Sequence, residues 1–213
     1  MQFSGFNAQD FNVFQINGLN ERMDAIKRLI RPKFQQLDEQ LTPFLSALTG
    51  QDIYPHIAKH ARRTVNPPDS TWIAFAASKR GYKKYPHFQI GLWRAHIFLW
   101  FACFNELEVK SALSASLLSH ERDVFNHIPS QFVWSLDHTV PAVIPQETLS
   151  PAGFHSMVER LGTIKKSELL CGLRIDKENE IAGSGEALLR LFKDSLEKLL
   201  PLYKEASECM PNR

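Results

Sequence analysis

The segments HFQIGLW (87–93) and AHIFLWFACF (95–104) decide the fold, because they predict two strands joined by a very short connection. Both are rich in β-branched and aromatic residues, which favour strands. A connection this short joins antiparallel neighbours. The run from Ile97 to Phe104 is apolar at every position, so we expect its strand to lie at the centre of a sheet that is covered on both faces.

Four further segments predict strands: 53–65, 71–78, 131–140 and 172–175, the last with Leu169 and Leu170 before it. Amphipathic periodicity predicts helices at about 20–48, 107–125, 150–162 and 184–203. Helices therefore flank a block of strands, which predicts a two-layer α+β fold with an antiparallel sheet of about six strands flanked by amphipathic helices. No low-complexity linker divides the chain, so we expect a single domain over residues 1–213.

The composition, the first residues and the cysteines exclude several classes of protein. Of the 213 residues, 44% are hydrophobic and 23% are charged, which excludes a coiled coil and wholesale disorder. The first residues lack the basic and apolar segments of a secretory signal, and no apolar run approaches the ~20 residues of a membrane span. The three cysteines form no C-x-x-C pair. We therefore expect a cytoplasmic protein without a membrane segment or a disulfide.

The motifs that would indicate a cofactor or a metal are incomplete. The GSG sequence at 183–185 lacks the third glycine of a dinucleotide-binding loop, because Leu188 stands in its place. His56 and His60 would be about 13 Å apart on the strand predicted over 53–65, which is too far for both to bind one ion. We therefore expect no metal and no cofactor.

The formal net charge of +2 conceals an uneven distribution of charge along the chain. Residues 51–100 hold eight basic and two acidic side chains, a balance of +6. Residues 101–213 hold twelve basic and sixteen acidic side chains, a balance of −4. Four of the eight histidines also lie within 51–100. We call residues 51–100 the basic block.

Alternation along the predicted strands gathers polar and aromatic side chains of the basic block on one sheet face. His56 and His60 point to the same side of the first strand, and His87 and Trp93 point away from the apolar side of the third. Arginine and lysine bind phosphate, and aromatic rings stack on bases. The candidate ligand-binding residues are His56, His60, Arg62, Arg63, Arg80, Lys83, His87 and Trp93.

Three functions remain open at this point. The first is a non-enzymatic cytosolic binder of a phosphorylated or other anionic ligand, nucleic acid included, through the basic, histidine-rich face of residues 53–96. The second is a metal-independent phosphoester-processing enzyme, with His56 or His60 as general base or acid and Arg62 with Lys83 stabilising the transition state. The third is a protein-interaction module with no small ligand. The alternative to all three is that the basic block binds no ligand. Its charged side chains would then form a solvated edge of the sheet or pair with the acidic half of the chain.

Two stretches of the sequence resemble a known family. PHIAKHARRTVNPPDSTWIAFAASKRGYKKYPHFQIGLW (55–93) and FSGFNAQDFNVFQINGLNERMDAIKRLIRPKF (3–34) resemble the YktB-like family of uncharacterised proteins from Bacillus-type bacteria. The resemblance covers about the first hundred residues, and Arg94 is not part of it. It implies a compact cytosolic protein with a two-layer α+β fold built on an antiparallel sheet. It implies no activity, and no catalytic residue is carried over from it.

Overall fold

A single antiparallel sheet of seven strands organises the structure, a computed structural model that describes residues 3–211. The strands are β1 (Tyr54–Ile57), β2 (Ser70–Ala76), β3 (His87–Trp93), β4 (His96–Cys103), β5 (Val133–Ser135), β6 (Ile144–Pro145) and β7 (Leu169–Asp176). Their order across the sheet is β1-β2-β3-β4-β7-β5-β6. The α+β class is confirmed, and so is the central position of β4. The single domain over 1–213 stays a prediction.

The helices lie before, between and after the strands. They are α1 (Ala8–Asn12), α2 (Leu19–Ala25), a π-helical segment (Ile26–Ile30), α3 (Arg31–Thr49), α4 (Lys110–Ser119), α5 (Glu121–His127), α6 (Pro151–Thr163) and α7 (Gly185–Glu208), with short 3₁₀ turns at Val13–Gln15, Gln146–Thr148 and Glu180–Gly183. The helix predicted over 20–48 is present as α2, the π-helical segment and α3 in succession. The helix predicted over 107–125 is wrong in its continuity, because the chain breaks at His120, whose φ is −141°.

Two strand predictions are wrong in their length. The strand predicted over 53–65 ends at Ile57, and the segment predicted over 131–140 is a strand only from Val133 to Ser135. The chain that follows β1 forms a loop, in which the carbonyl oxygen of Pro68 accepts a hydrogen bond of 2.9 Å from the guanidinium of Arg22 in α2. That contact ties the loop between β1 and β2 to the N-terminal helices.

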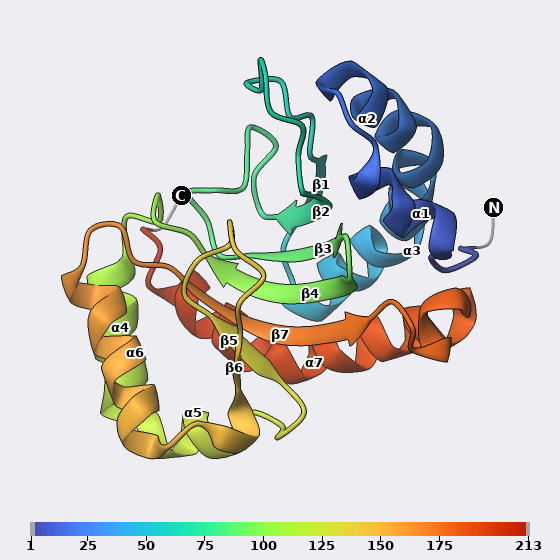
Figure 1. Ribbon diagram of the computed structural model, residues 1–213. Coiled ribbons are helices and arrows are strands. Elements are labelled where there is room, and N and C mark those ends of the chain that lie inside the picture. Colours follow the sequence, from blue (N-terminus) through green and yellow to red (C-terminus); the bar gives the residue numbers. More distant parts are fainter. Residues whose placement is uncertain (1–2, 212–213) are drawn as a thin grey trace.

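One face of the sheet carries the main hydrophobic core. Figure 1 shows α3 and α7 running behind this face. Phe75, Phe88 and Phe101 lie opposite one another on β2, β3 and β4, and all three are fully buried. The Phe88 ring stacks on Tyr203 of α7, with the ring centroids 4.9 Å apart. Burial of each such side chain contributes about 1.5–3 kcal/mol, so this row of rings fixes the sheet on α7.

The opposite face carries a smaller cluster, which is covered by loops rather than by helices within the described residues. The cluster consists of Phe98, Trp100, Ala102, Phe104 and Leu170, with Trp72, Tyr82, Trp93, Val133 and Val143 packed around it. In Figure 1 the connection between β5 and β6 passes in front of β4 and β7. β4 is therefore covered on both faces, as its apolar sequence predicted.

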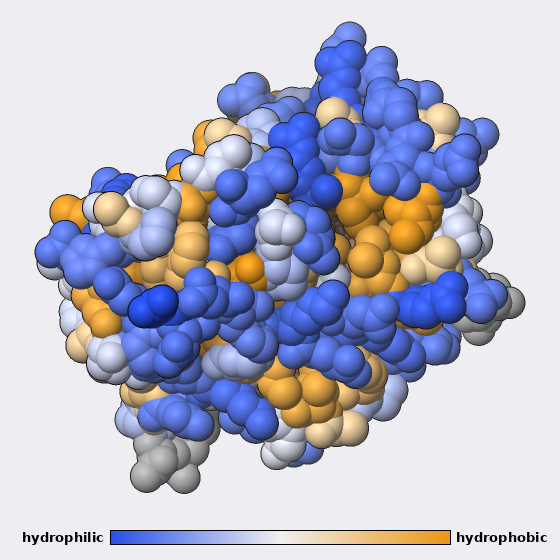
Figure 2. All heavy atoms as spheres, turned by 90° about the horizontal axis from the view of Figure 1, so that it is seen from below, coloured by the Kyte–Doolittle hydropathy of each residue, from blue (hydrophilic) through white to orange (hydrophobic). Residues whose placement is uncertain are grey.

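The outer surface is mainly hydrophilic in the view of Figure 2, where hydrophobic residues form separate patches rather than a continuous belt. Across residues 3–211, the structure has no helix with both the length and the apolar character that a bilayer crossing requires.

Candidate functional site

The candidate site is the loop-covered face of the sheet, which we call the aromatic face. We define it by the side chains of Trp72, Gln89, Trp93, His96, Phe98 and Trp100, which all line one small hollow of about 10 Å³. The strand register places them together, because Trp72 and Phe98 both lie opposite Gly91, and Gln89 lies opposite Trp100. The hollow continues to Asp137 and His138 in the β5–β6 connection.

Gly91 makes room on the aromatic face. A Cβ atom at this position would lie 2.3 Å from the Phe98 ring, 2.5 Å from the Thr71 carbonyl oxygen and 2.7 Å from the Trp72 Cβ. These distances are far below van der Waals contact. Glycine is therefore required for Trp72 and Phe98 to pack on either side of β3.

Trp72 is held in position by the loop between β2 and β3. Its indole Nε1 donates a hydrogen bond of 3.0 Å to the hydroxyl of Tyr82. Burial raises the pKa of Tyr82, so its hydroxyl stays neutral. The Tyr82 ring also meets the edge of His87, with the ring centroids 4.9 Å apart. Trp72 itself is only half-buried, so part of its ring remains accessible.

Trp93 and His96 form one end of the aromatic face, on either side of the β3–β4 turn. Their rings are nearly parallel, at 20° with centroids 6.2 Å apart. His96 is 3% exposed, and its Nδ1 is buried without a hydrogen-bond partner in the described part of the chain. Burial, followed by the charge of Arg174, lowers the pKa of His96 to about 4, although Asp176 opposes the shift. His96 is therefore neutral at pH 7, and its unpartnered ring nitrogen is buried beneath the surface.

His87 and Gln89 form a buried pair on β3. His87 Nδ1 donates to the carbonyl oxygen of Tyr85 at 2.8 Å, so Nε2 accepts from the Gln89 amide nitrogen at 3.1 Å. Burial lowers the pKa of His87 to about 3. His87 thus stays neutral and orients the Gln89 amide within the hollow.

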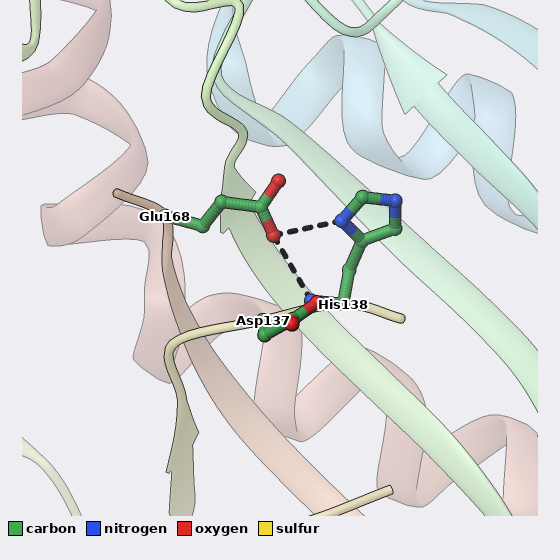
Figure 3. Close-up of side chains that lie close together, drawn as sticks. All are labelled: Asp137, His138 and Glu168. Carbon is green, nitrogen blue, oxygen red and sulfur yellow. Dashed lines mark hydrogen bonds and ion pairs between the residues drawn. The ribbon is translucent and has the colours of Figure 1, made fainter. Parts of the chain in front are cut away.

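His138 lies at the other end of the hollow and is held by Glu168 (Figure 3). Glu168 Oε2 accepts one hydrogen bond from the His138 backbone nitrogen at 2.9 Å and another from its Nδ1 at 2.7 Å. The Glu168 side chain is only 5% exposed. Because Nδ1 carries the proton, Nε2 has the free lone pair. The His138 ring also stacks on Phe104, with centroids 4.0 Å apart, which fixes its orientation.

Asp137, His138 and Glu168 each offer a metal-ligand atom within 4.8 Å of one another. These atoms are already engaged in hydrogen bonds, however. Glu168 Oε2 accepts both bonds from His138, and Asp137 Oδ1 accepts from the Thr139 nitrogen at 2.8 Å and from its hydroxyl at 2.6 Å. Hydrogen bonds therefore join His138 to Glu168, whereas Asp137 bonds Thr139 instead. The expected absence of a metal stays a prediction.

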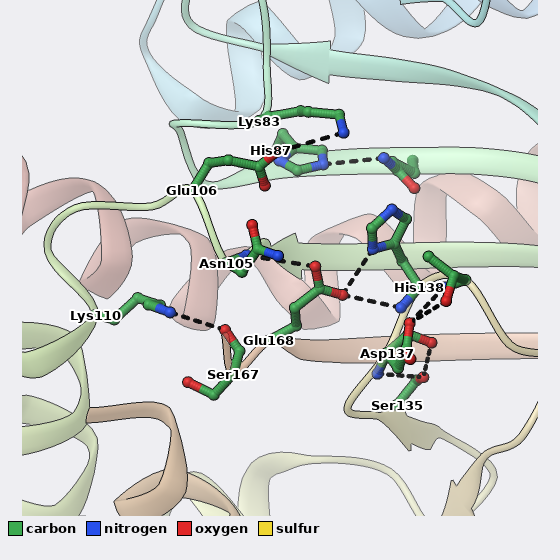
Figure 4. A network of polar contacts seen from close by, with 12 residues as sticks. Lys83, His87, Asn105, Glu106, Lys110, Ser135, Asp137, His138, Ser167 and Glu168 are labelled. Atoms are coloured by element: carbon green, nitrogen blue, oxygen red, sulfur yellow. Dashed lines mark hydrogen bonds and ion pairs between the residues drawn. The ribbon is translucent and has the colours of Figure 1, made fainter. Parts of the chain in front are cut away.

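A wider polar network surrounds this pair (Figure 4). The other carboxylate oxygen of Glu168 faces the backbone nitrogen of Asn105 at 3.4 Å. Next to it, the Lys110 ammonium donates to the carbonyl oxygen of Ser167 at 3.0 Å. The network anchors the start of β7, and hence Glu168, to the segment that follows β4. The position of Glu168 is thus set by the fold and not by a mobile side chain.

The structure brings four of the eight predicted site residues to this region. His87 and Trp93 lie on the face that alternation predicted, and His56 shares it through its register with Ala74. His60 is not on a strand, so the prediction that it shares a strand face with His56 is wrong. It follows β1 with a φ of 53°, and its ring meets the edge of Trp72 at 5.5 Å.

The four basic candidates lie in loops at the rim. Arg62 and Arg63 are exposed in the β1–β2 loop, and Arg80 and Lys83 are exposed in the β2–β3 loop. Lys83 pairs with Glu106 at 3.4 Å. Among residues 3–211, no carboxylate lies within ion-pair distance of the other three. The basic block is therefore paired only in part with the acidic half of the chain.

Sequence reasoning missed the aromatic residues and the histidine–glutamate pair. Phe98 and Trp100 were hidden in a run that is apolar on both strand faces, so no alternation set them apart. The one available signal was that Phe98 and Trp100 are two residues apart on β4, which places both side chains on the same face of the sheet. His138 and Glu168 are thirty residues apart, and they meet because β7 pairs with β5. No local pattern predicts that pairing.

A second hollow of about 720 Å³ lies apart from the aromatic face, at the C-terminal end of α7. Tyr54, Lys84, Glu108, Tyr203 and Met210 are among its lining residues. Its only charged pair at the rim, Lys84 with Glu108 at 2.8 Å, is self-neutralising and exposed. None of the eight predicted site residues lines it, and we take the aromatic face as the stronger candidate.

Comparisons with known proteins place the chain in a family. The family model described as "Domain of unknown function (DUF1054)" matches residues 6–203. A UPF0637 protein of Bacillus velezensis is 47% identical over 198 residues, covering 93% of this chain and 94% of the relative. A UPF0637 protein of Bacillus cereus is 46% identical over 203 residues, covering 95% and 98%. The resemblance to an uncharacterised Bacillus family is thus confirmed, and the chain belongs to the UPF0637 family, whose domain is DUF1054.

Proposed function

We propose that this protein binds a nucleoside phosphate on the aromatic face, either as a free nucleotide or within a single-stranded nucleic acid. The observation that carries the proposal is the gathering of Trp72, Trp93, Phe98 and Trp100 on one sheet face between basic loops. Sheet faces that present aromatic rings bind single strands by stacking two or three bases. Stacking contributes about 1–3 kcal/mol per base and tolerates any base, because every base has a π-face.

Two of the four rings are accessible to such a ligand. Trp72 and Trp93 are half-buried, whereas Phe98 and Trp100 lie beneath the β5–β6 connection. A nucleobase can therefore contact Trp72 and Trp93 directly. Phe98 and Trp100 form the layer of rings beneath them.

The rim supplies positive charge for phosphate. Arg62, Arg63 and Arg94 are exposed in the β1–β2 loop and the β3–β4 turn, without an ion-pair partner in the described chain. Arg174 lies opposite Phe98 on β7, where its guanidinium contacts the carbonyl oxygen of Pro141 at 3.3 Å. Arginine matches phosphate oxygens in a bidentate fashion.

The test is a titration followed by tryptophan fluorescence. Mononucleotides form one arm, and short single-stranded DNA and RNA form the other, each at two salt concentrations. We expect Trp72→Ala and Trp93→Ala each to weaken binding by roughly tenfold. We expect Arg62→Ala with Arg63→Ala to reduce the salt dependence, because fewer counterions are released.

The matched control is Arg122→Ala with Arg190→Ala, which removes two exposed arginines from the helices and should leave binding unchanged. Binding by the oligonucleotide arm alone identifies a strand as the ligand, and equal binding by the other arm identifies the free nucleotide. The proposal is contradicted if neither mononucleotides nor oligonucleotides bind at low salt. It is also contradicted if both tryptophan substitutions leave the affinity unchanged.

A further inference from the structure

The pair of His138 and Glu168 has a chemical capacity that ligand binding does not use. Glu168 is buried, and its Oε2 accepts the proton-bearing Nδ1 at 2.7 Å. A carboxylate in this position fixes the tautomer and stabilises the imidazolium that forms when Nε2 takes a proton. Phe104 holds the ring by stacking, so Nε2 is fixed in direction as well. This is the arrangement of an oriented general base.

The base also has access to a ligand. The His138 side chain is 19% exposed, unlike the fully buried His87. It lines the same small hollow, of about 10 Å³, as Trp72, Gln89 and Trp100. A nucleotide stacked on the exposed parts of Trp72 and Trp93 would lie at the mouth of this hollow, which His138 also lines.

The other histidines around the face lack this combination. His87 uses both ring nitrogens in hydrogen bonds, and His60 Nε2 bonds the Thr71 hydroxyl at 3.1 Å. Burial is the main cause that lowers the pKa of His60, to about 4. His56 Nε2 contacts the carbonyl oxygen of Ser78 at 2.8 Å, so it serves as a donor there. His56 and His60 thus lack the buried carboxylate partner that His138 has, and the role of base that the sequence suggested for them stays a prediction.

We propose that the protein cleaves single-stranded RNA at this site, with His138 as the general base. The inference rests on the proposed nucleoside-phosphate ligand. His138 Nε2 takes the proton of a ribose 2′-hydroxyl, and the 2′-oxygen forms a bond to the adjacent phosphorus. The bond from phosphorus to the 5′-oxygen of the next nucleotide breaks, and that oxygen takes a proton from water. The products are a 2′,3′-cyclic phosphate and a 5′-hydroxyl end, and the resulting hydroxide is neutralised by the proton that His138 releases.

The surroundings of His138 suit the charge that develops on phosphorus. The Gln89 side chain, which is 3% exposed, donates one of its two amide hydrogens to His87. The Lys83 ammonium lies 5.9 Å from the centre of the Phe104 ring, the same ring on which His138 stacks, and pairs with Glu106 at 3.4 Å. A positive charge near the reacting phosphate stabilises the negative charge that develops in the transition state.

The experiment incubates the protein with a single-stranded RNA of about 15 nucleotides in the presence of EDTA, and measures binding and cleavage on the same oligonucleotide. We expect products ending in 2′,3′-cyclic phosphate by mass spectrometry. The same sequence as DNA or 2′-O-methyl RNA should bind and remain intact. His138→Gln should slow cleavage by about 10²–10⁴-fold and change the dissociation constant less than about threefold.

Glu168→Gln is the second variant, because its amide oxygen can still accept from Nδ1 while the charge is lost. We expect it to slow cleavage at least tenfold. His155→Gln is the matched control, since His155 also bonds a glutamate, Glu121, at 2.7 Å but lies outside the hollow. It should cleave at the wild-type rate. Thermal melting confirms that each variant is folded.

Several outcomes would overturn the inference. RNA that is bound but stays intact refutes catalysis and leaves the proposed binding function standing. Cleavage that persists in both His138→Gln and Glu168→Gln, or that proceeds equally on 2′-O-methyl RNA, removes the assigned step. Failure to bind any oligonucleotide refutes this inference, and failure to bind mononucleotides as well refutes the proposed function.

Discussion

At the scale of single residues, two buried histidines, His87 and His96, and the half-buried His60 make stability depend on pH. Burial is the largest cause that lowers the pKa of His60 and His96 to about 4 and that of His87 to about 3. In the unfolded chain these groups titrate near 6.5. The unfolded state therefore binds more protons between these values, so the stabilisation is fully present above pH 6.5 and is lost as the pH falls toward 4.

We expect the free energy of unfolding to fall by up to about 1.4 kcal/mol per pH unit for each of these histidines in that window. Urea titrations at pH 7, 6 and 5 measure this slope. His87→Gln should make the free energy of unfolding depend less steeply on pH, by the contribution of one histidine. This holds whatever the substitution does to stability at pH 7. An unchanged slope in that variant would show that His87 takes up its proton in the folded state.

At the scale of the elements, β4 and β7 approach one another closely at Gly172. A Cβ atom there would lie 1.9 Å from the carbonyl oxygen of Leu99 and 3.1 Å from the Cα of Trp100. We expect Gly172→Ala to force these central strands apart, at a cost of about 1–3 kcal/mol in unfolding free energy. Gly81→Ala is the control, because no atom lies within 4 Å of the Cβ it would add. Equal melting temperatures for the two variants would contradict the close approach.

The elements also show what the sequence can and cannot predict. The hairpin of β3 and β4 was predictable because its signals are local: two apolar segments and a two-residue turn, Arg94 and Ala95. The end of β1 was not predictable from local signals, because the loop that follows it is held by a residue of a distant helix. That residue is Arg22, which donates a hydrogen bond to the carbonyl oxygen of Pro68. The sheet face on which His87 and Trp93 lie was predictable from alternation along the strand. The contact of His138 with Glu168 was not, because it depends on the pairing of β7 with β5.

At the scale of the whole molecule, the three thiols differ in their burial and therefore in their expected reactivity. Cys103 and Cys171 are fully buried in the core, and burial raises the pKa of both. Cys209 is partly exposed near the end of α7, where burial and two glutamates raise its pKa to a lesser degree. We expect one thiol per chain to react with a thiol reagent in the native protein and three in denaturant. Labelling followed by mass spectrometry assigns the site, and native modification of Cys171 would argue against this packing.

The strand order has a consequence for synthesis of the chain on the ribosome. β4 is completed at Cys103, but the strand that pairs with its second edge, β7, begins only at Leu169. At 5–20 residues per second, the edge of the most apolar strand waits roughly 3–13 s for its neighbour. A nascent chain therefore exposes an unpaired, aggregation-prone edge for seconds, and chaperones that shield such edges have their greatest effect on yield in that interval.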